Sequence, residues 1–260
     1  TKQLGDGKLL NQLTKKKIVY NFRKKDIENG GEGAPLTPLF HQLIVSEKKI
    51  KLPVCILNIG GISNITLVSK LKGTEELYSR DIGPGNCLID TWIRKNSDKK
   101  FDSNGLIASG GKKNEIIFEQ AQELYSNRQF KNSHSLDTND FDISFSRGLS
   151  LEDGAATLTE FTASIIGESL SKFLSKKNIN IERILICGGG RKNKTLVNAI
   201  IKNLPKKIKI DLIDNYGLDG DFIESQAFAY LAIRSFKKLP ITFPNTTNCK
   251  KPITGGEIVI

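Results

Sequence analysis

The clearest pattern along the chain is a pair of apolar runs separated by two glycines. Residues 54–59 and 62–68 are rich in Val, Ile and Leu, and Gly60-Gly61 stands between them. Two such runs joined by Gly-Gly are typical of a β-hairpin. The pattern therefore predicts a hairpin over 54–68 whose tip is nearly bare backbone.

Further along the chain, apolar positions recur at helical spacing. Helices are predicted over 114–125, 153–174, 194–203 and 221–237. Strands are predicted at 183–187 and 208–213, one on each side of the third of these helices. A strand, a helix and a strand in this order are typical of a parallel sheet, which indicates the α/β class.

Other stretches carry weaker patterns. Residues 1–82 read mostly as turns and strands, 171–180 as a surface connection, and 238–254 as a polar loop region, because polar and turn-forming residues interrupt their apolar positions. No internal repeat is visible. We expect two regions, 1–82 and 83–260, with a lobe boundary that the sequence leaves uncertain near residue 50.

One carboxylate stands near the end of an apolar segment and before a turn that is almost free of side chains. Residues 75–82 read as a strand that contains Asp81, and Gly83-Pro84-Gly85 follows it. Apolar spacing over 87–96 then predicts a helix with Asn86 as its N-cap. The two glycines would let backbone approach a bound group, and a helix start suits an anion. A tight structural turn with a solvated carboxylate explains the motif equally well.

Two more glycine clusters end or bend predicted strands. They are Gly60-Gly61, with Asn64 shortly after, and Gly188 to Gly190. None of the clusters has the spacing of a Walker A loop or of GxGxxG. Taken singly, each is more simply an ordinary turn. Taken together they favour a nucleotide cleft, in which backbone N–H groups from several strand ends cradle phosphates.

Composition and charge exclude some classes of function. The 260 residues are 38% hydrophobic and 26% charged, which is ordinary for a globular protein. The formal net charge is +11, but the lysines are scattered and aromatic residues do not interleave with them. The pattern therefore favours a solvated Lys-rich surface over a nucleic-acid partner, and nucleic-acid binding is kept as the less favoured alternative. No apolar run is long enough to span a membrane and no signal peptide is visible, so we expect no membrane contact and a cytoplasmic location.

Cysteine, histidine and methionine usage sets three further expectations. The four cysteines show no CxxC spacing, and Cys55 and Cys187 lie in apolar runs, as core residues of a reducing compartment do. His41 and His134 are too isolated for a metal cluster, so no protein-held metal is expected and any metal should arrive with the substrate. The chain contains no Met. We therefore expect a fragment whose start is missing.

Six segments carry a resemblance to a known family. They run in order along the chain: Asn21–Asp26, Gly30–Leu36, Leu57–Asn64, Asp81–Asn86, Ile186–Gly190 and Glu224–Ala229. Together they resemble the anhydro-N-acetylmuramic acid kinases of the sugar kinase, heat-shock 70 and actin superfamily. The resemblance implies an actin-like ATPase fold of the ribonuclease H-like type, with two lobes and ATP between them. It also implies that about the first third of the family's chain, including a first phosphate loop, is missing here, so that this fragment alone should be inactive.

The resemblance also implies a reaction. Members of the family open 1,6-anhydro-N-acetylmuramic acid with water and phosphorylate its O6 from ATP, with Mg²⁺, giving N-acetylmuramic acid 6-phosphate in peptidoglycan recycling and amino sugar catabolism. Asp81 matches the family's general base, which accepts a proton from the water that attacks the anomeric carbon. Glu224 matches an acid placed near the sugar, and the resemblance implies that it is the second catalytic residue. The expected partners are therefore a small sugar and ATP, and a homodimer is retained as one option for the assembly.

Further site residues follow from the same resemblance. Substrate contacts are implied for Arg23, Glu224 and Asn86, and nucleotide contacts for Gly60, Gly61, Asn64, Gly83, Gly85, Gly188, Gly189 and Gly190. Without the resemblance, Arg23 reads as a surface ion-pairing residue and Glu224 as a first-turn acid favoured by the helix dipole.

The chain departs from the family pattern at three positions. Asn21 stands where the family usually has Asp, and His134 and Thr138 stand where relatives commonly carry Lys and Arg. The alternative function is a catalytically impaired nucleotide-binding protein of the same fold. Such a scaffold would keep the glycine turns but lack a base, so the presence of Asp81 favours an enzyme.

Overall fold

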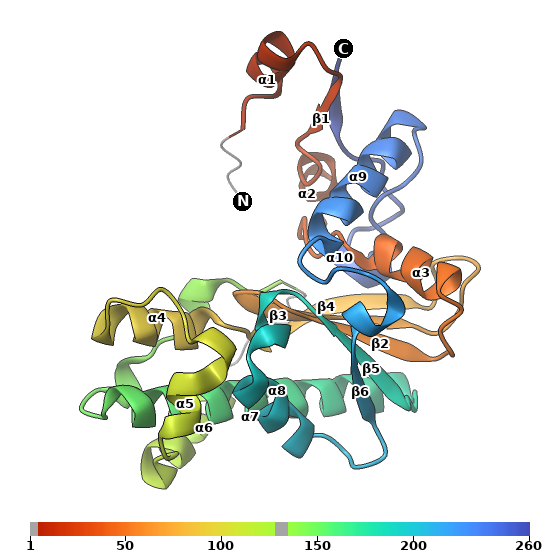
Figure 1. The fold of residues 1–260 in the computed structure, drawn as a ribbon. Coiled ribbons are helices and arrows are strands. Elements are labelled where there is room, and N and C mark those ends of the chain that lie inside the picture. The colour runs from red at the N-terminus through yellow and green to blue at the C-terminus, as the bar shows by residue number, and fades with distance from the viewer. Residues whose placement is uncertain (1–4, 128–134) are drawn as a thin grey trace. The chain divides into compact units, whose positions relative to one another are not determined.

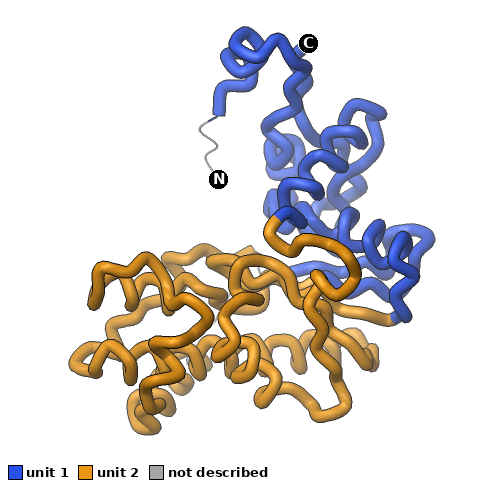
Figure 2. The backbone as a smooth tube through the Cα atoms, viewed as in Figure 1, with its two compact units in different colours: residues 1–52, 66–80, 222–260 blue, residues 53–65, 81–221 orange. Residues whose placement is uncertain are grey.

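The chain folds into two compact units, shown in different colours in Figure 2. The computed structural model describes residues 5–127 and 135–260. Unit 1 consists of residues 1–52, 66–80 and 222–260, and unit 2 of residues 53–65 and 81–221. The lobe boundary expected near residue 50 stays a prediction. The chain crosses between the two units more than once, and its C-terminal segment belongs to unit 1.

Unit 1 contains mainly helices and a two-stranded sheet. Its elements are α1 (Gly7–Thr14), β1 (Ile18–Tyr20), α2 (Lys24–Glu28), α3 (Pro38–Glu47), α9 (Ile223–Phe236), α10 (Pro244–Thr247) and β7 (Glu257–Val259). Strands β1 and β7 pair antiparallel, with Val19 opposite Ile258. Helix α3 packs against α9 (Figure 1), where the rings of Phe40 and Tyr230 lie 6.0 Å apart.

Unit 2 contains most of a five-stranded sheet and the helices that cover it. Its elements in chain order are β2 (Val54–Ile59), β3 (Ile62–Val68), β4 (Leu77–Pro84), α4 (Cys87–Asn96), η1 (Ser103–Gly105), α5 (Leu106–Gly110), α6 (Glu115–Asn127), η2 (Thr138–Asp140), η3 (Ser144–Ser146), α7 (Leu151–Lys177), β5 (Arg183–Cys187), η4 (Gly189–Lys192), α8 (Lys194–Lys202), β6 (Lys209–Leu212) and η5 (Ile213–Tyr216). The distal parts of β3 and β4 belong to unit 1.

The sheet has the strand order β4-β3-β2-β5-β6. Strand β2 pairs parallel with β5, and β5 pairs parallel with β6, so that Ile186 lies between Leu57 and Leu212. Only an antiparallel pair can be joined by a two-residue turn, and the connection from β3 to β4 is also too short for a parallel crossover. Strands β4, β3 and β2 are therefore antiparallel neighbours, whereas β2, β5 and β6 are parallel neighbours. This mixed sheet with helices confirms the α/β class and agrees with the ribonuclease H-like type.

The core of unit 2 follows from the two central strands and one long helix. Residues Val54 to Leu57 of β2 and Ile184 to Cys187 of β5 are completely buried, as expected for strands covered on both faces. Helix α7 packs against α4, α5, α6 and α8 (Figure 1) and buries Leu158, Ile166 and Leu170. Cys55 and Cys187 are core residues, as predicted, and burial raises the pKa of the Cys55 thiol.

Several predicted elements are confirmed with little change. The hairpin forms over 54–59 and 62–68, and α4 and β5 have the predicted bounds. The helices expected at 114–125, 153–174, 194–203 and 221–237 appear as α6, α7, α8 and α9, and the strand expected at 75–82 appears as β4.

The prediction of mostly turns and strands before the hairpin was wrong at α1, α2 and α3, of which α3 is the longest. Residues 38–47 form a helix whose inward face includes Pro38, His41, Gln42 and Val45, all buried and spaced three or four apart. Two polar residues on that face conceal the helical period of the apolar ones. Proline at the first helical position also starts the helix, since it lacks an N–H that would go unpaired there.

The surface connection predicted at 171–180 was also wrong for most of its length. Helix α7 continues to Lys177 and ends at Asn178, which has a left-handed φ of 53°. Phe173 and Leu174 extend the buried face, while Ser and Lys occupy the other faces of the same helix. The region 238–254 contains the short α10 and a bridge between Thr242 and Ile253.

Candidate active site

The glycine turns predicted from the sequence meet at one edge of the unit 2 sheet. Strands β2, β4 and β5 run in the same direction, so their carboxyl ends lie together. The N–H of Gly85 donates to the carbonyl of Gly61 at 2.8 Å, and the N–H of Asn86 donates to the carbonyl of Gly60 at 2.8 Å. The turn after β4 is therefore fastened to the turn after β2 by two backbone hydrogen bonds.

Close packing against backbone and side-chain atoms explains why some of these positions are glycine. A Cβ at Gly85 would lie 2.3 Å from the carbonyl oxygen of Gly60. A Cβ at Gly188 would lie 2.4 Å from Oδ1 of Asn58, and one at Gly190 would lie 2.2 Å from Cγ2 of Ile59. The turn after β5 thus packs directly on the end of β2. At these positions the protein itself fills the space that a side chain would need.

Asn86 lies where the three turns meet. It occupies the N-cap position of α4, as predicted, but its side chain makes no capping hydrogen bond. Its Nδ2 instead donates to the carbonyl of Gly60 at 3.2 Å and lies 3.0 Å from the position of a Cβ on Gly190. The structure therefore gives the Asn86 side chain a role in holding the turns together.

Two glycines of the cluster face open space. No heavy atom of the residues that the structure describes lies within 4 Å of a Cβ built on Gly189. At Gly61 the one neighbour within that distance is Cγ2 of Thr138, at an ordinary 3.6 Å. Gly83 differs, because its Cβ would lie 2.6 Å from Cγ2 of Ile165 in α7. Gly61 and Gly189 are thus the positions where bare backbone is accessible to a ligand.

The carboxylate of Asp81 lies on β4, just before this cluster. The residue is 9% exposed. Its Oδ2 accepts a hydrogen bond of 2.7 Å from the backbone N–H of Leu136, which lies 55 positions further along the chain. A donor to one carboxylate oxygen fixes the plane of the group and stabilises its charged form. Asp81 is therefore an oriented carboxylate in a mostly buried setting.

The segment that supplies this donor is itself braced. Asp137 caps η2, and the N–H of Asp137 donates in return to Oδ2 of Asp140 at 2.7 Å, which completes a capping box. Thr138, within the same turn, has its methyl group against Gly61. Residues 136–140 therefore contact both the carboxylate and the first glycine turn.

Asn64, on β3, has an unusual polar atom. Its Oδ1 is buried and has no hydrogen-bond partner among the described residues. The neighbouring Ser63 hydroxyl, by contrast, donates to the carbonyl of Pro84 at 3.0 Å and ties β3 to β4. A buried polar atom without a partner is costly unless water or a ligand satisfies it.

Arg23 and Glu224 belong to unit 1, and each is described within that unit. Arg23 donates through Nη1 to the carbonyl of Gly33, and Asp26 accepts the N–H of Gly33 at 2.8 Å and the hydroxyl of Thr247 at 2.7 Å. Arg23 and Asp26 thus brace the glycine-containing loop at 30–35. Glu224 is exposed in the first turn of α9, next to the buried Ile223.

The departures from the family pattern have partial explanations. Asn21 has a left-handed φ of 53°, which asparagine tolerates well, and its Nδ2 donates to Glu257 at 3.3 Å. Thr138 lies beside Gly61, as described above. His134 lies outside the described residues.

Sequence reasoning missed one set of charged residues next to the third glycine turn. Arg191 follows the turn directly and its side chain is buried, with ion pairs to Asp214 and Asp221. A hydrogen bond from Arg191 holds the pKa of Asp214 below its ordinary value, and the bond to Asp214 raises the pKa of Arg191. The only sequence signal was an arginine directly after the glycines. It could not identify the partners 23 and 30 positions away.

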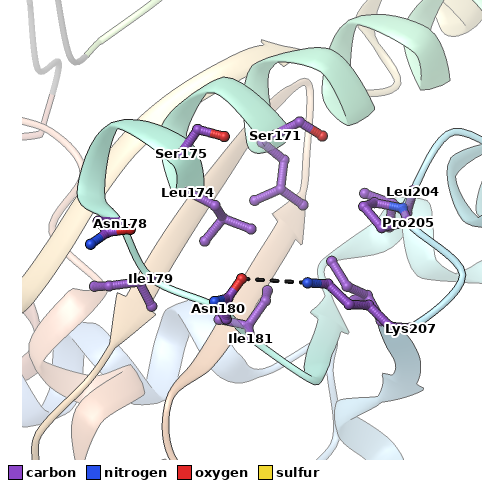
Figure 3. A pocket seen from close by; sticks show the side chains of 12 residues that line it. Ser171, Leu174, Ser175, Asn178, Ile179, Asn180, Ile181, Leu204, Pro205 and Lys207 are labelled. Atoms are coloured by element: carbon purple, nitrogen blue, oxygen red, sulfur yellow. Dashed lines mark hydrogen bonds between the residues drawn. The ribbon is translucent and has the colours of Figure 1, made fainter.

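A separate cavity lies away from these residues. It has a volume of about 360 Å³ and is formed by the end of α7 and the connections that precede β5 and β6 (Figure 3). Its lining includes Leu174 and Ile181 together with Asn180 and Lys207, whose side chains are joined by a hydrogen bond. It is thus at the amino ends of the strands, whereas the glycine turns are at the carboxyl ends. Since it contains neither a carboxylate nor a glycine turn, it is not the candidate active site.

Two other kinds of site are absent from the described residues. No group of three or more His, Cys, Asp or Glu side chains is placed to hold a metal ion within 5–127 and 135–260. Across the same part of the chain, no helix has the length and apolar character needed to cross a bilayer.

Comparisons with known proteins agree on one family. A family model described as anhydro-N-acetylmuramic acid kinase matches residues 1–260. A protein of that name from Pelagibacter ubique (strain HTCC1062) is 53% identical over 259 residues, covering 100% of this chain and 69% of its own length. One from Zymomonas mobilis is 40% identical, covering 99% of this chain and 68% of its own length. The chain thus spans about two thirds of these relatives.

A solved structure shows a weaker likeness. The activator of the 2-hydroxyisocaproyl-CoA dehydratase from Clostridium difficile, with bound ADPNP, is 13% identical to the chain. The similarity covers 76% of this chain and 67% of that one, with a TM-score of 0.42.

Proposed function

The chain belongs to the anhydro-N-acetylmuramic acid kinase family, and from this premise we propose how its own residues serve the family's phosphotransferase reaction. Water attacks the anomeric carbon of 1,6-anhydro-N-acetylmuramic acid and the bond from that carbon to the bridging oxygen breaks. That oxygen, now O6, takes the γ-phosphoryl group of ATP. The products are N-acetylmuramic acid 6-phosphate and ADP, and one proton from water has to be accepted.

Asp81 is the residue that accepts this proton. The observation that carries the assignment is its carboxylate, which is mostly buried, oriented by the Leu136 N–H and placed on the strand that leads into the glycine turns. A general base must be held in a defined orientation toward the water. Phosphorylation of the departing oxygen takes the place of the acid that a glycosidase uses, so one carboxylate suffices.

The open glycines and Asn64 supply the nucleotide contacts. Bare backbone at Gly61 and Gly189 admits a close approach by phosphate oxygens, since neither position is filled by the protein itself. The buried Oδ1 of Asn64, near the first turn, is an acceptor without a partner among the described residues. A water molecule or a donor group of the bound nucleotide would supply its missing hydrogen bond. Gly83, Gly85, Gly188 and Gly190 contribute indirectly, because packing against other parts of unit 2 requires them to be glycine.

Mg²⁺ would enter this site with ATP, since this ion is commonly bound through substrate phosphates and one or two carboxylates. When bound, it neutralises charge on the transferring phosphoryl group.

In this proposal Glu224 acts on the sugar directly, and Arg23 acts through the loop at 30–35. Glu224 contacts the sugar directly, which its exposure permits. The contact of Arg23 with the Gly33 carbonyl supports a role in shaping the loop at 30–35 rather than a free guanidinium on the substrate.

We further propose a cytoplasmic enzyme that assembles as a homodimer. No observation favours the alternative of a catalytically impaired nucleotide-binding protein.

The test uses a protein of the relatives' full length that contains this chain, here called the full-length protein. It is incubated with ATP, Mg²⁺ and the anhydro sugar in ¹⁸O-labelled water, and the products are examined by mass spectrometry and ³¹P NMR. The proposal expects one ¹⁸O at the anomeric carbon and none in the phosphate. N-Acetylmuramic acid, which lacks the bridge, is the control sugar. Label in free phosphate without sugar phosphate would show simple ATP hydrolysis and contradict the proposal.

A further inference from the structure

The buried Arg191 side chain connects the third glycine turn to a second segment of unit 2. Its side chain is 5% exposed. Nε and Nη2 donate to the two oxygens of Asp214 at 2.8 and 3.0 Å, and Nη1 donates to Asp221 at 2.6 Å. Nη1 also donates to the carbonyl of Gly188 at 3.1 Å. One guanidinium thus binds the start of the turn and the segment 214–221 at the same time.

The carbonyl that Arg191 holds belongs to a residue with unusual backbone angles. Gly188 has φ 80° and ψ 170°, a region that is open almost exclusively to glycine. Such a conformation persists only where its surroundings hold it. On one side Gly188 lies against Asn58, and on the other its carbonyl is taken by Arg191. The shape of the turn, and so the direction of the open backbone at Gly189, depends on the guanidinium.

A purely stabilising ion pair is the simpler explanation, and Arg183, a second ion-paired arginine of unit 2, offers the comparison. Arg183 starts β5 and pairs with Asp211 of β6, where it also donates to the hydroxyl of Tyr216 at 2.7 Å. It is 38% exposed and lies at the opposite end of β5 from the glycine turn. Burial of a charged pair is weak evidence for stability, since desolvation offsets much of the attraction. Arg191 is buried in spite of this desolvation cost. It differs from Arg183 because it also donates to the Gly188 carbonyl of the glycine turn.

We propose that Arg191 is a positioning residue for nucleotide binding, which holds the Gly188 to Gly190 turn in the shape that receives ATP through its link to Asp214 and Asp221. The inference rests on the proposed function, since it assigns this turn to the nucleotide. The forked guanidinium of Arg191 is essential for this role. A lysine at the same position would keep the charge but could not pair bidentately with Asp214 while also holding a carbonyl. Loss of the link weakens nucleotide binding and leaves the sugar contacts as they are.

The experiment compares Arg191→Lys with Arg183→Lys in the full-length protein. Calorimetry gives the Kd for ATP without sugar, steady-state kinetics give KM for each substrate, and a thermal scan gives the folded fraction at the assay temperature. We expect Arg191→Lys to raise the nucleotide Kd roughly 10- to 100-fold, as misplaced binding groups do, with the sugar KM changed less than about twofold. Arg183→Lys should leave both constants within about twofold of the unmodified protein.

Asp214→Asn is the milder variant for the case in which Arg191→Lys does not fold, since that carboxylate is half exposed and its loss leaves the bond to Asp221. It should weaken nucleotide binding in the same direction. Unchanged nucleotide Kd in the folded Arg191→Lys or Asp214→Asn protein would overturn the proposal, and so would an equal loss in Arg183→Lys. If the unmodified protein binds ATP but does not open the anhydro sugar, the proposed function fails while the Kd comparison still tests Arg191.

Discussion

Two alanine substitutions at glycines of the same cluster should have opposite effects. Gly85 is enclosed, because a Cβ there would lie 2.3 Å from the Gly60 carbonyl oxygen, about 1 Å closer than ordinary contact. Gly189 is open, since none of the described heavy atoms lies within 4 Å of its Cβ position, and it has no left-handed φ. Gly85→Ala therefore tests packing between turns, and Gly189→Ala tests the space that the protein leaves to a ligand.

The magnitude of the Gly85→Ala effect follows from the contacts that must give way. Overpacking costs typically about 1–3 kcal/mol. Separating the turns also weakens the bonds from Gly85 to Gly61 and from Asn86 to Gly60, each with a net value of about 1 kcal/mol. We expect a loss of about 3–5 kcal/mol. For a chain of this size that lowers the thermal midpoint by roughly 10 °C.

Gly189→Ala should leave the free energy of unfolding within about 0.5 kcal/mol of the unmodified protein, as surface substitutions usually do. A methyl group in the space that receives the nucleotide should nevertheless weaken ATP binding about tenfold or more. Thermal scans and calorimetry on both variants of the full-length protein give the two quantities. The reasoning is refuted if Gly85→Ala melts normally, or if Gly189→Ala binds ATP with unchanged affinity.

Two further predictions concern buried polar residues of unit 1. Burial lowers the pKa of His41 to about 3, whereas an unfolded histidine titrates at about 6.5. The contribution of His41 to stability is therefore complete above pH ~6.5. It is lost as the pH falls toward 3, by up to about 1.4 kcal/mol per pH unit. Urea unfolding between these pH values should therefore show a shallower loss for His41→Gln than for the unmodified protein, and parallel curves would contradict the assignment. Asp26→Asn replaces an acceptor that serves both Gly33 and Thr247, so we expect a loss of about 1–3 kcal/mol in the free energy of unfolding; an unchanged thermal midpoint would argue against this role.

Much of the fold could be predicted where local pattern and final environment agree. The hairpin at Gly60-Gly61 and the strand 183–187 are continuous apolar runs that end in glycine, and the structure buries them as such. Helix α3 could not be recognised in this way, since His41 and Gln42 are polar yet face inward. The end of α7 was hidden by serines and lysines on its outer faces.

The candidate site was predictable in part for a similar reason. Strand direction brings the glycine turns to one edge, so their convergence follows from topology. The partner of Asp81 does not, because the donor is a backbone N–H of Leu136, and a backbone group carries no signature in the sequence. The acceptor of the Asn86 side chain is likewise a backbone group. The sequence therefore could not show that this side chain would donate to the Gly60 carbonyl instead of capping its own helix.

The most direct test of the account is the turnover of Asp81→Asn in the full-length protein, measured with its thermal midpoint and ATP affinity on one sample. The asparagine keeps an oxygen that can accept the Leu136 N–H, so the fold and nucleotide binding should be retained. Removal of a general base costs typically about 10²–10⁴-fold in rate, and we expect sugar opening and phosphoryl transfer to fall together by at least that factor. Near-normal turnover per folded molecule, with a lowered thermal midpoint, would show instead that Asp81 is structural and contradict its assignment as the base.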